Sequence, residues 1–272
     1  MSYFKALSNG IKENLYQLNN EMEKINESTS NLNKVAKITL LFWVMKIIAT
    51  TLGETLGDLL AQTLQLGYAF GLGITGVFFI LVLFIQLKAK KYVPILFWLV
   101  IVGTTTVGTE VSDFMDRTLH LGYLAGSLIL ITLLLNTLWI WHRTIGKIEV
   151  YPIFNRKVEL FYWTAILFSN SLGTAFGDFL SDNVGLSYLQ GAMVTAGVII
   201  IVVLLHYVTK INYIILFWIA FIFTRPFGAT FGDLLTKPIA QGGLNLGTIP
   251  ATLISITILG LLVFYSHKKK LD

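Results

Sequence analysis

The sequence contains no cysteine, which excludes disulfide bonds, thiolate metal sites and iron–sulfur clusters. Its four histidines are scattered at the ends of apolar segments or in the loops between them, without the spacing of a metal site. Phosphate-binding loops, nucleophile elbows and dinucleotide-binding fingerprints are also missing. We therefore predict a protein that is not an enzyme and has no covalent cofactor.

Charged residues are also scarce, at 13% of the chain, whereas 55% of the residues are hydrophobic. The mean hydropathy is +0.72. This composition is typical of a polytopic membrane protein, an all-α chain whose main partner is the lipid bilayer. Eight apolar runs are long enough to cross a bilayer of about 30 Å. They lie at residues 38–60, 66–87, 93–115, 121–141, 160–181, 186–207, 212–235 and 244–266.

The distribution of basic residues predicts how the chain is oriented. The first 37 residues are polar and lack the apolar core of a cleavable signal peptide, so the first run is expected to act as an uncleaved signal. Basic residues follow the even-numbered runs, at Lys88, Lys90, Lys91, Arg143, Lys147, Arg156, Lys157, Lys210 and Lys268 to Lys270. The positive-inside rule then places both termini in the cytoplasm. These clusters indicate orientation rather than nucleic-acid binding.

One pattern recurs four times along the apolar region. A tryptophan stands fifteen residues before an aspartate, in the pairs Trp43/Asp58, Trp98/Asp113, Trp163/Asp178 and Trp218/Asp233. A fixed internal period indicates a repeated structural unit. The tryptophans themselves are interpreted as an interfacial belt and packing layer. Acids inside membrane helices are costly and usually functional, so a cation pathway is the leading hypothesis.

The repeat divides the chain into segments. Residues 38–141 hold repeats one and two, residues 160–266 hold repeats three and four, residues 142–159 form a cytoplasmic linker, and residues 267–272 are a basic tail. Two spans per repeat make every repeat enter the membrane in the same direction. Parallel repeats place equivalent residues at one level. We therefore predict eight transmembrane helices with pseudo-fourfold symmetry and a ring of four aspartates.

Residues 1–37 form a separate arm. Its apolar residues recur at helical spacing, at Ile11, Leu15, Leu18, Met22 and Ile25, which is typical of an amphipathic helix with a narrow seam. Such a helix can lie on the membrane surface, pack on the cytoplasmic loops or pair with another chain. If the protein forms a homo-oligomer, we expect residues 1–37 to mediate it.

The aspartates are expected to share a helix face with other oxygen-bearing side chains, because residues four and eight apart lie on one side of a helix. Glu54, Thr50, Thr105 and Asn170 stand on such faces, and Glu110, Asp116 and Asp182 lie close by. Hard oxygen donors suit manganese, magnesium, calcium or protons. We predict Asp58, Asp113, Asp178 and Asp233 as metal ligands, assisted by these acids, with Arg225 adjusting the charge.

Charge counting supports the same site. The region contains eight acids and three bases, Arg117, Arg225 and Lys237, which leaves five acids without an obvious basic partner. Unpaired carboxylates in a low-dielectric environment either hold protons or bind a cation. The glycines around the aspartates allow two interpretations: close helix packing, or broken helices whose carbonyls become ligands.

Residues 38–266 resemble a bacterial family of integral membrane proteins with four tandem two-helix repeats, catalogued as a repeat of unknown function. The resemblance rests on LFWVMKIIATTLGETLGD at 41–58, GTEVSDFMDR at 108–117, LFSNSLGTAFGDFLSD at 167–182 and TRPFGATFGDLLTKP at 224–238. It implies the topology of a multi-pass protein of the bacterial inner membrane rather than an activity.

Repeat one is also similar to manganese and calcium exporters that carry Glu-x-Gly-Asp followed by Lys-Thr. Glu54-Thr55-Leu56-Gly57-Asp58 has one extra residue and no Lys-Thr after it. The other three repeats lack the glutamate, and those exporters use inverted three-helix repeats. The similarity is one of chemistry and suggests manganese.

These observations predict a transporter of a small cation. The leading form of this hypothesis is a proton-coupled exporter of a divalent metal of the manganese type. The cation or proton would be its substrate. Three alternatives stay open: a membrane scaffold or sensor that recruits a partner through residues 1–37, a passive cation channel, and an intramembrane enzyme.

Overall fold

The structure, a computed structural model, describes residues 16–17 and 33–269. These residues form eight long α-helices and no strand. The helices are α2 (Leu40–Asp58), α3 (Tyr68–Lys88), α4 (Pro94–Asp113), α5 (Tyr123–Ile145), α6 (Arg156–Asp178), α7 (Tyr188–Val208), α8 (Tyr213–Thr236) and α9 (Thr248–Lys269). Each begins and ends within a few residues of a predicted apolar run. The predicted amphipathic arm, residues 1–37, lies outside the described residues except for Tyr16, Gln17 and residues 33–37.

Seven of these helices are long and apolar enough to cross a membrane, judged by length and composition. The exception is α6, which has 23 residues but contains the polar sequence Ser169-Asn170-Ser171 in its middle. The helices are therefore compatible with a multi-pass membrane protein, as predicted. A membrane crossing by α6 stays a prediction.

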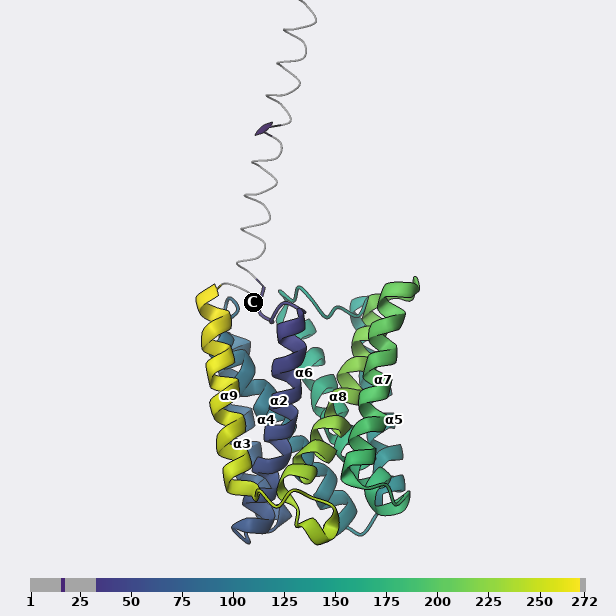
Figure 1. Ribbon diagram of the computed structural model, residues 1–272. Coiled ribbons are helices and arrows are strands. Elements are labelled where there is room, and N and C mark those ends of the chain that lie inside the picture. Colours follow the sequence, from purple (N-terminus) through teal and green to yellow (C-terminus); the bar gives the residue numbers. More distant parts are fainter. Residues whose placement is uncertain (1–15, 18–32, 270–272) are drawn as a thin grey trace, which may run out of the picture.

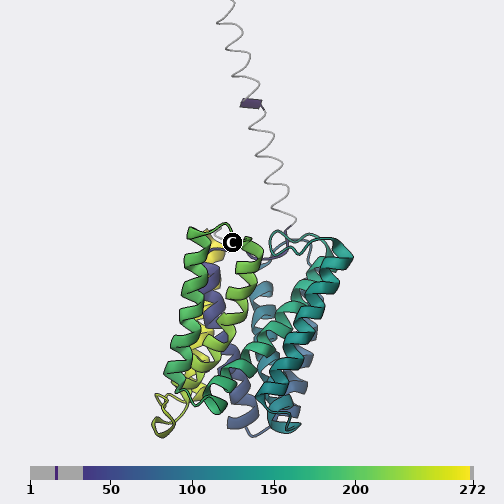
Figure 2. The same ribbon diagram turned by 90° about the vertical axis from the view of Figure 1, so that its right-hand side faces the viewer.

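Four core helices form a closed ring inside the bundle. Helix α2 packs against α4 and α8, and α6 packs against the same two helices. The other four lie outside this ring, with α3 on α4, α5 on α6, α7 on α8 and α9 on α2 (Figures 1 and 2). The last helix thus packs on the first. In the core helices α2, α4 and α8, 61–72% of the most apolar stretch is buried inside the bundle. In the outer helices this share is only 22–28%.

The core helices all run in the same direction, so the bundle has two different ends. We call the end where they begin, near the tryptophans, the aromatic end, and the end where they reach their aspartates the acidic end (Figure 1). After the aspartate, α2, α4 and α6 each continue into a five-residue π-helical turn, at Leu59–Thr63, Phe114–Thr118 and Phe179–Asn183. Helix α8 departs from this pattern: it contains Pro226 and continues as α-helix to Thr236.

Glycines fix the contacts between neighbouring core helices. Each core helix has a glycine five residues before its aspartate, and this glycine faces the next core helix. The residue it faces there lies eight positions before the aspartate of that next helix. A Cβ on the glycine would lie 2.3–3.0 Å from that neighbour, in the pairs Gly53/Thr105, Gly108/Asn170, Gly173/Arg225 and Gly228/Thr50. The helices continue through these glycines without a break. The close-packing interpretation is therefore the correct one at these positions.

We expect Gly173→Ala to destabilise the bundle by about 1–3 kcal/mol, the usual cost of overpacking. Its new Cβ would lie 2.5 Å from Cβ of Arg225 and 2.9 Å from Cδ of Pro226. The matched control is Gly197→Ala in α7, where an added Cβ would have no atom within 4 Å. The unfolding midpoint in detergent should fall for the first variant only. Equal midpoints would contradict a close contact between α6 and α8.

Candidate functional site

A column of polar side chains fills the middle of the core ring. It is built in layers from equivalent positions of the four core helices, at eight and four residues before each aspartate, at the aspartate, and four residues after it. In that order the layers are Thr50, Thr105, Asn170 and Arg225; Glu54, Thr109, Thr174 and Ala229; Asp58, Asp113, Asp178 and Asp233; and Gln62, Arg117, Asp182 and Lys237. All twelve residues of the first three layers are buried. We call this set the polar column.

Arg225 connects the first two layers across the ring. Its Nη2 atom lies 2.8 Å from Oε2 of Glu54 and also donates to the hydroxyl of Thr109. Its Nη1 atom donates to the carbonyl of Thr50 at 3.4 Å. The guanidinium is fully buried. One arginine therefore joins α8 to α2 through a buried ion pair and to α4 through a hydrogen bond.

The four aspartates are bridged in pairs by two bases of the last layer. Arg117 lies 3.2 Å from Oδ1 of Asp113 and 3.4 Å from Oδ2 of Asp178. The Nζ atom of Lys237 lies 2.7 Å from Oδ2 of Asp58 and 3.3 Å from Oδ1 of Asp233. Lys237 stands just beyond the end of α8. Although burial disfavours its charge, the carboxylates of Asp233 and Asp58 raise the pKa of Lys237 above its usual value.

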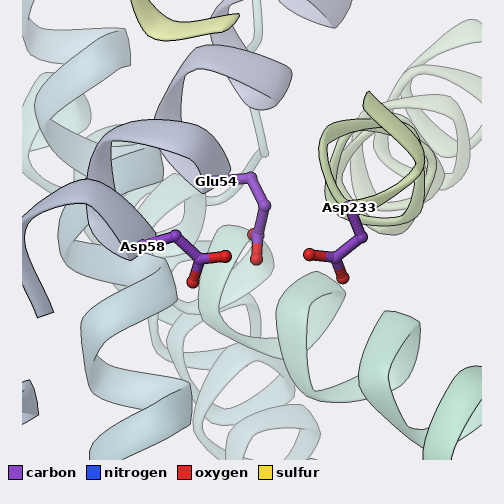
Figure 3. A group of neighbouring side chains, drawn as sticks. All are labelled: Glu54, Asp58 and Asp233. Atoms are coloured by element: carbon purple, nitrogen blue, oxygen red, sulfur yellow. The ribbon is translucent and has the colours of Figure 1, made fainter. Parts of the chain in front are cut away.

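Three carboxylates meet beside this lysine. Glu54 and Asp58 point from α2 toward Asp233 on α8 (Figure 3). One oxygen atom of each lies within 4.8 Å of the other two, and all three residues are buried. Three converging carboxylate oxygens suit a hard divalent cation. Such an ion and the ammonium group of Lys237 would compete for the carboxylates of Asp58 and Asp233.

A cavity of about 350 Å³ opens at the acidic end. Its lining includes Arg117, Asp178, Asp182, Asp233 and Lys237, so it reaches the last two layers of the polar column. Two of the paired aspartates, Asp178 and Asp233, therefore line a polar vestibule.

The aromatic end of the column is closed by packed rings. Phe42 packs on Trp98, Phe97 on Trp163 and Phe217 on Trp43, with ring centroids 5.7, 5.4 and 5.6 Å apart. Each contact joins neighbouring core helices. Trp98, Trp163 and Trp218 are at most 6% exposed. The tryptophans thus form the predicted packing layer inside the bundle, but these three do not form a lipid-facing belt.

One base inside the bundle was not predicted. Lys46 is fully buried four residues before Thr50, where its Nζ atom donates to Oδ1 of Asn170 at 3.0 Å and lies 4.1 Å from the ring centroid of Phe221. Its position in an apolar run gave no sign of a role. The only available signal was its place on the same helix face as Thr50, Glu54 and Asp58.

Four consecutive stretches of the chain match the family described as Repeat of Unknown Function (DUF347), at residues 41–92, 96–146, 161–212 and 216–271. The chain belongs to the DUF347 repeat family. No curated protein and no solved structure matches it. Each DUF347 repeat here supplies one core helix and one outer helix, so the predicted family and its four tandem two-helix repeats are confirmed.

The DUF347 repeats do not bring all the predicted site residues into the column. Glu110 faces Gly71 of α3, and Asp116 faces Gly126 of α5, so both point toward outer helices. Asp182 belongs to the last layer of the column, where it accepts a hydrogen bond from the hydroxyl of Tyr123 at 2.7 Å. The other predicted residues, including Thr50, Thr105 and Asn170, lie in the column. Their binding of a cation stays a prediction.

The charge count needs a correction. From the numbers of acids and bases we predicted five acids without a basic partner. Among the eight acids considered, only Glu110, Asp116 and Asp182 lack an ion pair in the described chain. The count was wrong because Arg117 and Lys237 each bridge two aspartates that come from neighbouring DUF347 repeats. A second unpredicted pair joins Lys34 to Glu159 near the aromatic end, where Gln86 also donates to Glu159 at 2.9 Å.

Proposed function

We propose that this protein is a membrane transporter of a small cation and that the polar column is its pathway. The observation that carries this proposal is the column itself: all four repeats contribute to one buried line of polar residues that ends in a cavity. The four repeats are related by a pseudo-fourfold axis along the column. Buried ionisable groups in a membrane bundle generally mark ion or proton pathways.

The substrate is a divalent cation of the manganese type, moved out of the cell. With both termini in the cytoplasm of an inner-membrane protein, the aromatic end faces the cytoplasm and the cavity faces outward. The packed rings close the cytoplasmic side, so this arrangement corresponds to the state after release. Glu54, Asp58 and Asp233 hold the ion in the preceding state. Return of the Lys237 ammonium to Asp58 and Asp233 then expels the ion into the cavity.

One observation favours a second candidate, a membrane scaffold or sensor. All four ring aspartates are paired with protein bases, as they would be in a network that serves only to hold helices together. In that case the repeats preserve a fold, and a partner binds elsewhere on the protein.

Flux into proteoliposomes distinguishes these functions. We expect wild-type protein to move manganese, magnesium or calcium, and Asp113→Asn and Asp178→Asn to reduce this flux to background while the purified variants stay folded. Each variant removes a negative charge from the ring and leaves the side-chain volume unchanged.

The second candidate predicts another result: no flux of any of these ions or of protons in wild type, together with unfolding of both variants. A passive channel would conduct without responding to a pH gradient. A proton-coupled carrier would respond to one.

A further inference from the structure

Glu110 is a buried acid outside the polar column. It lies three residues before Asp113 on α4 and is 0% exposed. Its carboxyl group faces α3, where a Cβ on Gly71 would lie 2.7 Å from Oε1 and 2.9 Å from Oε2. Within the described part of the chain, neither oxygen has a hydrogen-bond partner. Gly71 therefore leaves room for a carboxyl group that has no hydrogen-bond partner among the described residues.

The other repeats show that packing does not require an acid at this position. The equivalent residues are Thr55, Ala175 and Thr230. The hydroxyls of Thr55 and Thr230 donate to carbonyls of their own helices, at Leu52 and Pro226. Repeat two alone places an ionisable group between a core helix and an outer helix at this level.

The surroundings of Glu110 disfavour a negative charge. Helix α2 contributes the acids Glu54 and Asp58, whose charges act on Glu110. Other ionisable groups at this end of the bundle are Tyr68 at the start of α3, Asp178 at the end of α6, and Asp113 and Asp116 on α4 and the turn that follows it. The base Arg117 is engaged by Asp113 and Asp178. A buried carboxylate without a donor costs several kcal/mol, so Glu110 holds a proton in this state.

We propose that Glu110 is a proton-binding site coupled to cation binding in the column. This inference rests on the proposed transport function and specifies its coupling. A divalent cation at Glu54, Asp58 and Asp233 lowers the net negative charge near Glu110. The O–H bond of Glu110 then breaks and its proton passes to water, and the reverse happens when the cation leaves. Because coupling between two sites is reciprocal, proton uptake also weakens cation binding. The result is exchange of protons for the cation.

The first test measures the proton directly. Infrared spectroscopy of the purified protein at neutral pH should show the carbonyl stretch of a protonated carboxylic acid, and manganese should diminish this band. Glu110→Gln should lack the component that responds to manganese. Glu110→Thr should give the same result and should fold, because repeats one and four carry threonine there. The control is Thr55→Ala, which gives repeat one the alanine of repeat three and should keep the response.

The second test measures coupling in proteoliposomes. Wild type should accumulate manganese when driven by a pH gradient. Glu110→Gln should lose this accumulation but keep manganese exchange between the two sides. Gradient-driven accumulation by Glu110→Gln, with normal manganese flux, would overturn the coupling and leave the transport function intact. If wild type shows no flux, the infrared band still decides: without a protonated-acid component from Glu110, the proton-binding site itself is wrong.

Discussion

Replacing Arg225 with methionine is expected to destabilise the bundle by about 3–5 kcal/mol, the usual cost of removing one partner from a buried ion pair. The guanidinium is fully buried and is the only base within 4.0 Å of Glu54 in the described chain. Its loss leaves the Glu54 carboxylate and the hydroxyl of Thr109 without their donor. The measurement is unfolding of the purified protein in mixed detergent micelles.

A double-mutant cycle separates charge from packing. Glu54→Gln combined with Arg225→Met should recover much of the lost stability, because neither member of the ion pair then leaves an unpaired charge behind. The control is Lys147→Met, which breaks an exposed pair with Glu149, and such pairs contribute about 0–1 kcal/mol. If the two core substitutions were simply additive, the ion pair would not couple α8 to α2.

The helices, and the common depth of their aspartates, were predictable because both depend on local sequence pattern. Apolar runs gave the helix bounds, and the fixed distance from tryptophan to aspartate placed one acid at the same depth in each core helix. Helical spacing also placed Glu54 and Thr50 on the face of Asp58. These features need only the geometry of single helices and the period of the repeat.

The partners across the ring were not predictable in the same way. Lys237 reaches Asp58 over 179 positions of sequence, and Arg225 reaches Glu54 over 171. Both contacts depend on the closure of repeat four against repeat one, which no local pattern indicates. Whether Glu110 faces α3 depends on which side of α4 this outer helix packs against. Because each residue turns a helix by about 100°, Glu110 points about 60° away from Asp113 and faces a different neighbour.

Lys237→Gln is expected to make the stability of the protein depend strongly on divalent cations. The substitution removes the ammonium group from Asp58 and Asp233 but leaves both carboxylates beside Glu54. Without a divalent ion, the variant should unfold at a lower temperature than wild type. A bound cation replaces the missing charge, and at about one hundred times its dissociation constant it contributes about 2.7 kcal/mol. Thermal unfolding with and without manganese, magnesium or calcium measures this rescue.

Arg117→Gln is the matched control, because Arg117 also bridges two aspartates. In the described chain, however, Asp113 and Asp178 do not belong to a group of three converging carboxylates, whereas Asp58 and Asp233 do. The cation should therefore rescue Lys237→Gln more strongly than Arg117→Gln, and wild type should respond least because Lys237 still occupies its site. Equal responses of all three proteins would place the metal elsewhere. A larger response of Lys237→Gln would identify the lysine as a tethered competitor of the transported ion, since only its removal frees the three carboxylates.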